Sequence, residues 1–360
     1  MTKNKSKLIS KGSSGCVFRP QIKCGKTKKS KKSKKSKKSI TKLMFTQDNL
    51  EYNFNEIIKK IKGYNKWTVL WDDKCKSQSY KELLKHTDIE KCLINVDDSK
   101  YHEDHRFLLY QGSYAGVNMK SYCEKHITKQ ILTDQTKFIK FFLKIFRLVK
   151  NVFYGLTQLY NHNICHHDIT IQNILIKGVK SYIIDYDISL KITDIQNNKF
   201  LKKRMIEEYS VPRIFEAYPF EYIYYRLNKS EDILDEQKTI SSKNIINYYE
   251  LYEPIHNLIF DIDTDKLRFE LLEDKRNGSV MDLDELMKKL DTYSLGMLMI
   301  IPFLDAAERL NISLEPIIDF FRSKELKPYM DLIRDMISFN YHDRITPNES
   351  YERYLNLIRK

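Results

Sequence analysis

Two carboxylates and one amide occur at spacings that could bring them into a single site. Asp168 stands in HHDITIQN, Asn173 follows it with four residues between, and Asp185 lies 17 residues beyond Asp168 in IIDYD. Each borders a short apolar run that is typical of a strand, so all three are expected on loops. One carboxylate could take up a hydroxyl proton while the other groups hold Mg²⁺. The pattern therefore favours metal-assisted transfer of a phosphoryl group.

The first third of the chain is predicted to be a sheet with one main helix. Residues 7–23 hold two β-type runs around a Gly/Ser turn, and ITKLMF at 40–45 is a third run. KCLINV at 91–96 and RFLLYQ at 106–111 are also predicted strands. Apolar residues at helical spacing predict a helix over 48–61, with Asp48 suited to its N-cap.

The chain becomes helical after the Gly-containing connection GSYAGVN. The segment TKFIKFFLKIFRLVKNVFYGLTQLYNHN predicts one long helix that is buried on one side. The longest apolar run, Leu295–Leu304, is about half the ~20 residues that a membrane span needs, so a buried helix is expected there. Residues 222–290 carry mixed charges without a signature and are interpreted as a helical insertion.

The pattern HHDITIQN followed by IIDYD resembles the eukaryotic-type protein kinases, with their catalytic loop H-R-D-L-x-x-x-N and their metal-binding turn D-F-G. ISKGSSGCV looks like the Gly-rich loop of that family. Lys42 matches the strand lysine that touches the α- and β-phosphates, and Glu56 is its expected ion-pair partner, with Glu51 as a rival. The residues expected to contact the nucleotide in the Gly-rich loop are Ile9, Ser10, Gly12, Ser13, Ser14, Gly15 and Val17.

Three marks in the second half extend the resemblance over nearly the whole chain. YPFE ending at Glu221 resembles the A-P-E element, DTYSLG from Asp291 resembles a helix start of the family, and DRITP surrounds Arg344. In the family, the late arginine pairs with the A-P-E glutamate, and the aspartate accepts hydrogen bonds from the catalytic loop. Together with the Lys-rich insert, these marks look most like the serine/threonine-protein kinases of giant DNA viruses.

The resemblance implies an α+β, bilobal protein-kinase fold. We expect a β-rich N-lobe over 1–110, a hinge at 111–116 and a helical C-lobe over 117–360, with ATP bound between the lobes. Asp168 would be the catalytic base, Asn173 and Asp185 would hold Mg²⁺, and the γ-phosphate of ATP would pass to serine or threonine of a protein substrate. A viral protein of this kind would act inside the cell, in the host cytoplasm or the virion.

Four departures from the family keep two alternatives open. Ser10 replaces the first glycine, His167 the arginine that receives an activation-loop phosphate, Thr170 a lysine near the γ-phosphate, and Asp187 the glycine of D-F-G. DYD is similar to turns of the aminoglycoside and choline phosphotransferases, which lack the DTYSLG and DRITP features. The alternatives are therefore a small-molecule kinase, or a pseudokinase or scaffold that binds nucleotide, a partner or nucleic acid without turnover.

The net charge of +14 is concentrated in one segment. Nine lysines lie between Lys26 and Lys38, and subtracting them leaves +5 for the rest of the chain. The tract at 26–39 has no apolar face and repels itself, so a disordered loop is expected. Electrostatic binding of nucleic acid or an acidic protein is its secondary interpretation, and no membrane partner is expected.

The cysteines indicate reduced thiols in an intracellular protein. There are six, and none forms a C-x-x-C pair. No disulfide is therefore expected. His162, Cys165, His166 and His167 cluster in sequence, but they do not form a four-ligand set at zinc-finger spacing, so catalytic-loop spacing explains them better.

Overall fold

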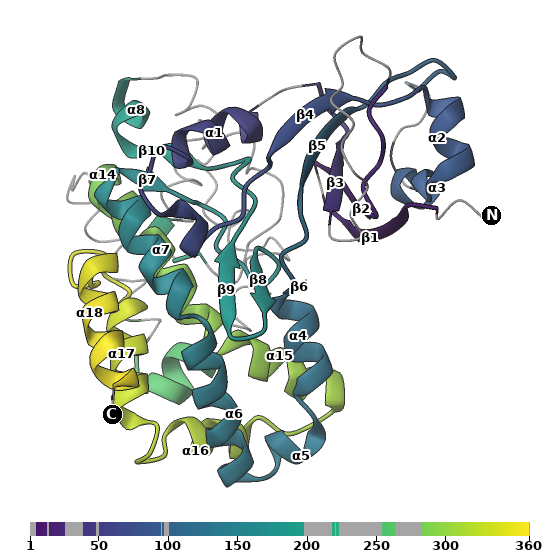
Figure 1. Ribbon diagram of the computed structural model, residues 1–360. Helices are drawn as coiled ribbons and strands as arrows, with labels where there is room; N and C mark the ends of the chain where they lie inside the picture. Colours follow the sequence, from purple (N-terminus) through teal and green to yellow (C-terminus); the bar gives the residue numbers. More distant parts are fainter. Residues whose placement is uncertain are drawn as a thin grey trace, which may run out of the picture. The chain divides into compact units, whose positions relative to one another are not determined.

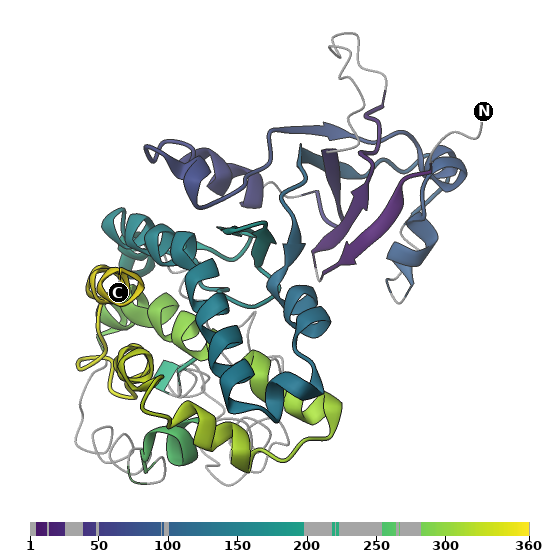
Figure 2. The same cartoon turned by 60° about the horizontal axis from the view of Figure 1, so that its bottom comes forward.

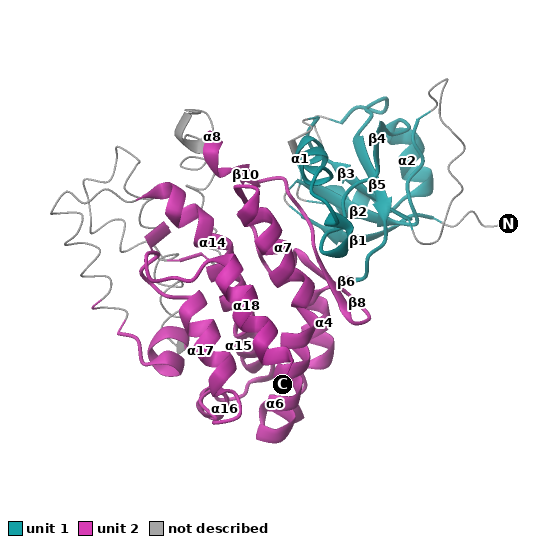
Figure 3. Cartoon of the chain, turned by 60° about the vertical axis from the view of Figure 1, so that its left-hand side comes forward, with its two compact units in different colours: residues 1–116 teal, residues 117–360 magenta. Residues whose placement is uncertain are grey.

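The chain divides into two compact units, Met1–Gly116 (unit 1) and Val117–Lys360 (unit 2), which are coloured separately in Figure 3. The computed structural model describes residues 5–12, 14–25, 39–47, 50–94, 96, 101–197, 218–219, 221–222, 254–263, 266 and 282–359. The predicted disordered tract therefore lies outside the described residues, except for Ser39. The same holds for most of the predicted insertion at 222–290.

Unit 1 is built on an antiparallel sheet with the strand order β1-β2-β3-β5-β4 in its described part (Figure 1). The strands are β1 (Lys7–Lys11), β2 (Gly15–Arg19), β3 (Ser39–Met44), β4 (Asp73–Lys76) and β5 (Leu108–Ser113). The helices are α1 (Leu50–Ile58), the 3₁₀ turn η1 (Tyr64–Lys66), α2 (Tyr80–His86) and α3 (Ile89–Leu93). The predicted hinge at 111–116 begins inside β5, where Ser113 still pairs with Ser39.

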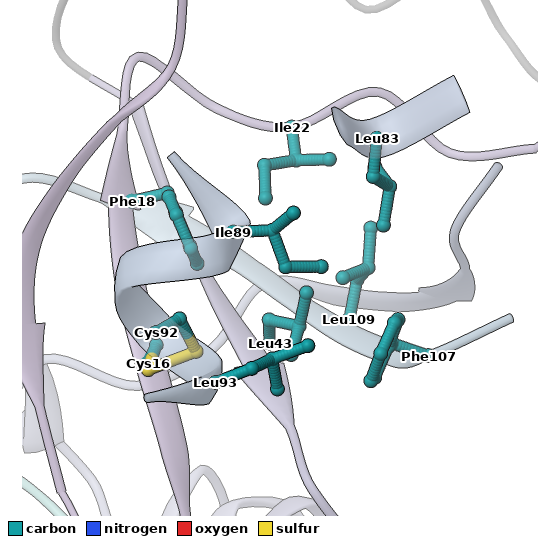
Figure 4. Close-up of a cluster of buried hydrophobic side chains, with 10 residues drawn as sticks. All are labelled: Cys16, Phe18, Ile22, Leu43, Leu83, Ile89, Cys92, Leu93, Phe107 and Leu109. Carbon is teal, nitrogen blue, oxygen red and sulfur yellow. A yellow bond between two sulfur atoms is a disulfide. The ribbon is translucent and has the colours of Figure 1, made fainter. Parts of the chain in front are cut away.

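The two faces of this sheet carry separate apolar clusters, because side chains alternate along each strand. One cluster packs against α2 and α3 (Figure 4). It consists of Cys16, Phe18, Ile22, Leu43, Leu83, Ile89, Cys92, Leu93, Phe107 and Leu109. A smaller cluster contains Met44, Leu108 and Tyr110, and Tyr52 of α1 packs against it. The second cluster is the one that joins α1 to the sheet.

The predicted strand at 91–96 is wrong, because this segment begins within the short helix α3. Ile89, Cys92 and Leu93 of this helix are all buried in the first cluster. Their spacing of three and four residues places them on one side of a helix. A short apolar run does not by itself distinguish a buried strand from a buried helix, and here the packing decided.

The expectation of six reduced cysteines is also wrong. Disulfides join Cys16 to Cys92 and Cys24 to Cys75, while Cys123 and Cys165 are free and buried. Figure 4 shows the bond between β2 and α3. The bonded cysteines are 76 and 51 residues apart, so short-range spacing carried no sign of them. The intracellular location loses the support that cysteine chemistry seemed to give it.

Unit 2 is mainly helical, with short strands near its start (Figure 1). Its strands are β6 (Val117–Asn118), β7 (Ile164–Cys165), β8 (Ile174–Lys177), β9 (Lys180–Ile183) and β10 (Leu190–Lys191). The helices in its first part are α4 (Met119–His126), α5 (Lys129–Leu132), α6 (Gln135–Leu148), α7 (Lys150–Asn161) and α8 (Ile192–Asn197). The later ones are the π-helical turn η3 (Pro254–Ile259), α14 (Leu283–Leu298), α15 (Ile301–Leu310), α16 (Glu315–Phe321), α17 (Lys327–Met336) and α18 (Pro347–Ile358).

The long helix predicted before Asp168 is two helices, because the chain breaks at Val149 between α6 and α7. The buried face of α6 packs its aromatic rings against α15 and α16, with Phe138 4.8 Å from Phe303 and 5.0 Å from Phe321 between ring centroids. The C-terminal helix α18 lies along α7, where Tyr354 stacks on Phe153 (Figures 1 and 2). Helix α7 is thereby held at the core of the unit.

Helices α14 and α15 contain the apolar run that was predicted to be buried. The stretch Leu283–Leu310 is long and apolar enough to cross a membrane by length and composition alone, but its apolar window is 94% buried inside the protein. Burial of this degree is what a core helix shows. Asp282 is the N-cap of helix α14, and its side chain accepts hydrogen bonds from the backbone N–H groups of Asp284 and Glu285. The helix already covers the last residues assigned to the insertion.

The predicted α+β content is confirmed. A β-rich sheet forms the N-terminal part, and the C-terminal part is helical. This content is compatible with the bilobal fold that the resemblance implies.

Candidate active site

Lys42 lies on the central strand β3, where it is almost fully buried (5% exposed). The register aligns Val17 of β2, Lys42 and Tyr110 of β5 across the sheet. Directly paired residues of neighbouring strands point to the same face. Ile40, two residues before Lys42, shares this face. Ile40 and Lys42 therefore occupy one side of the sheet, together with Val17 and Tyr110.

The partner of Lys42 is Glu51, and the prediction of Glu56 is wrong. Lys42 Nζ lies 2.8 Å from Glu51 Oε2, and both side chains are buried. Glu56 instead is exposed, and its Oε1 lies 2.6 Å from Nζ of Lys59, the residue that follows α1. The two glutamates are five residues apart, which turns them by about 140° around a helix. The way α1 packs on the sheet turns Glu51 inward.

Glu51 has a second partner that the sequence reasoning missed. Trp71 Nε1 donates a hydrogen bond of 2.6 Å to Glu51 Oε1, the oxygen that does not face Lys42. Trp71 lies 20 residues from Glu51, just before β4. No local sequence pattern connects the two residues.

The Gly/Ser turn joins β1 and β2 as expected. Gly12 N donates to Gly15 O at 2.8 Å, which closes the turn. A Cβ on Gly15 would lie 2.1 Å from the Leu43 backbone oxygen, so only glycine allows β2 to approach β3 here. Ser10 pairs with Val17 after a bulge in β1, and the side chain of Ile9 is half exposed. The backbone oxygen of Ser14 accepts a hydrogen bond from Phe45 N. Ser13 lies outside the described residues.

Asp168 lies on the loop between β7 and β8 in unit 2. Asn173 Nδ2 donates to the Asp168 backbone oxygen at 3.0 Å and to its Oδ2 at 2.6 Å. Asp168 Oδ1 is buried, and it has no hydrogen-bond partner among the described residues. The loop thus fixes one carboxylate oxygen and leaves the other able to accept a proton.

The pKa of Asp168 is raised to about 7. Burial is the largest cause, followed by the neighbouring carboxylates of Asp185 and Asp187, while the hydrogen bond from Asn173 acts in the opposite direction. A group with a pKa near neutrality can both accept and release a proton under physiological conditions. This is the property required of a general base.

His166 supports the loop as a neutral imidazole. Its Nδ1 accepts from the Asp168 backbone N–H at 3.2 Å, so Nε2 carries the proton and donates to Ile184 O at 3.0 Å. Burial lowers the pKa of His166 to about 4, which keeps the ring uncharged. The ring also packs edge-on against Tyr186. His166 therefore joins the loop of Asp168 to the segment that carries Asp185.

Asp185 follows β9 and adopts a left-handed backbone conformation, with φ of 70°. Such a conformation is uncommon for residues other than glycine and is enriched at functional sites. Ile184 N donates to Asn173 O at 3.0 Å, which holds the two predicted Mg²⁺ ligands on adjacent segments. The effect of Asp185 on the pKa of Asp168 also indicates that their carboxylates are near each other.

These residues fit Mg²⁺ held jointly with a phosphate. Within the described residues, no three His, Cys, Asp or Glu side chains gather as a ready-made metal cage. Mg²⁺ usually takes one or two carboxylates and completes its shell with water and substrate phosphates. The Asn173 nitrogen is committed to Asp168, so its amide oxygen would be the atom that binds the cation, together with the Asp185 carboxylate. That donor set suits a cation brought in with its phosphate.

Asp291 on α14 holds the backbone of the loop that carries Asp168. Its Oδ2 accepts from His166 N at 2.7 Å and its Oδ1 from His167 N at 3.0 Å. His167 has a φ of 68°, so the backbone is strained at the point where these bonds hold it. The His167 ring contacts Tyr222, and the Tyr218 hydroxyl donates to the His167 backbone oxygen. Both tyrosines are contacts that the sequence reasoning did not anticipate.

Glu221 and Arg344 form a fully buried ion pair, which joins the YPFE segment to the loop before α18. Arg344 also donates to Ser338 O at 3.0 Å from Nε, and its guanidinium lies 4.8 Å from the centre of the Tyr293 ring. A buried charge needs partners of this kind. The contact between these distant residues holds Glu221, and with it Tyr222, close to His167.

The predicted residues thus fall into two sets, one in each unit. Lys42 and the glycine turn belong to unit 1, whereas Asp168, Asn173 and Asp185 come together in unit 2.

No protein-family model matches the chain, and no curated protein matches it significantly.

Proposed function

We propose that the protein is a kinase of the eukaryotic protein-kinase type, which transfers the γ-phosphate of MgATP to serine or threonine hydroxyls of a protein. The observation that carries the proposal is the loop at Asp168. One oxygen of this carboxylate is held by Asn173, and the other is buried without a partner among the described residues. That geometry suits a base that takes a proton from an incoming hydroxyl.

In the proposed reaction, the substrate oxygen attacks the γ-phosphorus, the bond to the leaving ADP oxygen breaks, and the hydroxyl proton passes to Asp168. Lys42 binds phosphate oxygens of the nucleotide, with its position set by Glu51. Asn173 and Asp185 would hold Mg²⁺, which would neutralise the charge that develops on the phosphates. His166 and Asp291 keep the loop of Asp168 in place.

Two contacts support a protein kinase over a small-molecule kinase. The resemblance implies that the late arginine pairs with the A-P-E glutamate and that the aspartate of DTYSLG accepts hydrogen bonds from the catalytic loop. Arg344 pairs with Glu221, and Asp291 accepts from His166 and His167. The aminoglycoside and choline phosphotransferases lack both sequence features, so these contacts favour a protein substrate.

The finer points rest on the resemblance. They are the bilobal protein-kinase fold, the cofactors ATP and Mg²⁺, and action in the host cytoplasm or the virion of a giant DNA virus. Binding of nucleic acid or an acidic protein by the lysines at 26–38 is a separate, secondary proposal.

The test is transfer of radiolabelled γ-phosphate from MgATP to a generic basic protein, with Asp168→Ala as the inactive variant. Wild-type protein should label the substrate, and Asp168→Ala should not, although its melting curve should still show a folded protein. Full activity in Asp168→Ala would overturn the assignment. Labelling of free aminoglycosides or choline in place of protein would favour the small-molecule kinase. No labelling, together with no thermal stabilisation by MgATP, would favour the scaffold.

A further inference from the structure

We infer that Trp71 is a positioning residue whose indole N–H holds Glu51 in the orientation that pairs with Lys42. The inference deepens the proposed function, on which its kinetic part rests. Nothing in the resemblance assigns a role to this tryptophan.

The Glu51 carboxylate lies between two donors, one on each oxygen. Lys42 Nζ is 2.8 Å from Oε2, and Trp71 Nε1 is 2.6 Å from Oε1. Glu51 is only 2% exposed, so its charge depends on partners within the protein. Two donors on opposite oxygens fix the rotation of the carboxylate, whereas one donor alone would allow it to turn.

Helix α1 gives Glu51 little support of its own. The helix has nine residues, and Glu51 lies in its first turn, where helix ends fray. Trp71 comes from a different segment, and the neighbouring Asp72 N donates to Gln111 O of β5 at 2.8 Å. The indole therefore ties Glu51 to the sheet that also carries Lys42. The hydrogen bond connects the end of a short helix to a rigid element.

The Trp71 ring is itself held in place by β5. Its centroid lies 6.3 Å from that of Tyr110, the residue paired across the strands with Lys42. A Cβ on Gly112 would lie 3.1 Å from Trp71 Cε3, so the absence of a side chain at this position makes room for the ring. Strand β5 thus leaves room for the indole next to Tyr110, the residue that pairs with Lys42 of β3.

The other tryptophan provides a matched control. The chain has two tryptophans, and Trp67 lies four residues before Trp71. Trp67 is fully buried, and its Nε1 has no hydrogen-bond partner within the described part of the chain. Replacement by phenylalanine keeps an aromatic ring at either position. It removes the donor to Glu51 only at Trp71.

The kinetic test compares Trp71→Phe with Trp67→Phe. Loss of the donor should let Glu51 turn and leave Lys42 less well placed for the phosphates. We expect the KM for MgATP to rise and kcat/KM for MgATP to fall about tenfold in Trp71→Phe, with the KM for the protein substrate unchanged. Trp67→Phe should lower the melting temperature and leave both KM values unchanged. A loss of folding alone would lower kcat without moving the KM for MgATP.

The inference is overturned if Trp71→Phe keeps the wild-type KM for MgATP, or if Trp67→Phe raises that KM by the same factor.

A second measurement, of tryptophan fluorescence, does not need catalysis. Glu51→Ala should shift the tryptophan emission maximum, because it removes the acceptor of the indole N–H, whereas Glu56→Ala should leave it unchanged. This comparison is made in the wild-type protein and in Trp67→Phe, where Trp71 is the sole tryptophan.

The two measurements separate the inference from the proposed function. If wild-type protein transfers no phosphate but Glu51→Ala shifts the emission, the proposed function fails and the contact of Trp71 with Glu51 stands. If phosphate transfer is normal and neither glutamate variant shifts the emission, the contact is absent and the inference is overturned. The emission test also decides the matter if Trp71→Phe does not fold.

Discussion

Asn173 Nδ2 lies 2.6 Å from Asp168 Oδ2 and 3.0 Å from the Asp168 backbone oxygen. One side chain therefore fixes both the carboxylate and the backbone of the proposed base. Because Nδ2 makes these two bonds, the amide oxygen would be the ligand for the proposed Mg²⁺. Asn173 would link the base to the cation with opposite ends of one amide.

Asn173→Ala should reduce kcat by about 100-fold or more, since the base loses its orientation and the cation loses a ligand. The measurement is kcat at saturating MgATP, with the melting temperature recorded to show that the variant folds. Asn348→Ala, at an asparagine that bonds to Asn161, is the control and should keep wild-type kcat. An unchanged kcat in Asn173→Ala would contradict the role given to this residue.

Glu51→Gln should reduce kcat/KM for MgATP by about tenfold, whereas Glu56→Gln should remain within about twofold of wild type. The reason is that Glu51 is the buried carboxylate against Lys42, and Glu56 forms a surface pair with Lys59. Steady-state kinetics of the two variants decide between them. The reverse order of effects would restore Glu56 as the partner.

Asp291 should make the stability depend on pH between about 4 and 6. Burial raises the pKa of Asp291 to about 6 from 3.8, although hydrogen bonds from His166 and His167 oppose the rise. The folded protein thus holds this proton where the unfolded chain has released it. The contribution of Asp291 to the free energy of unfolding therefore falls as the pH rises from about 4 to about 6.

The measurement is the unfolding free energy of wild type and Asp291→Asn across this range. As the pH rises from about 4 to about 6, the unfolding free energy of wild type should fall by about 3 kcal/mol relative to that of Asp291→Asn, since one pKa unit corresponds to about 1.4 kcal/mol. Asp319→Asn, at an exposed position, should follow the wild-type pH dependence. Parallel curves for wild type and Asp291→Asn would show that the pKa of Asp291 is not raised.

Thiol titration should find two reactive cysteines in denatured, unreduced protein and six after reduction, because four cysteines are paired. Reduction should also lower the melting temperature, since a disulfide closing a loop of this length stabilises a fold by about 4 kcal/mol. Cys123→Ser should show the same drop on reduction, because Cys123 is free. Six reactive thiols without reductant would contradict both pairings.

Residues close in sequence were predicted well. Asp168 and Asn173 are five residues apart on one loop, and the structure brings them into direct contact. The side chains of Ile40 and Lys42 share one face because side chains alternate along any strand. The Gly/Ser turn likewise lies between two strands. Such features depend on local geometry, which neighbouring residues largely determine.

Features that join distant residues were not predictable in the same way. Both Glu51 and Glu56 fit the helix pattern, and only the rotation of α1 against the sheet decided between them. The segment at 91–96 has an apolar run suited to a strand, but the disulfide and the core hold part of it as α3. Periodicity describes one segment and carries no information about its partner.

The sequence by itself determined the spacing of Asp168, Asn173 and Asp185, the strand position of Lys42 and the division into a β-rich and a helical part. Only the tertiary structure decided that Glu51 pairs with Lys42, that Trp71 holds Glu51, and that Cys16 bonds to Cys92. The physical reason is that burial and pairing are set by which segments pack together. That packing is a property of the whole fold, and no single stretch of sequence contains it.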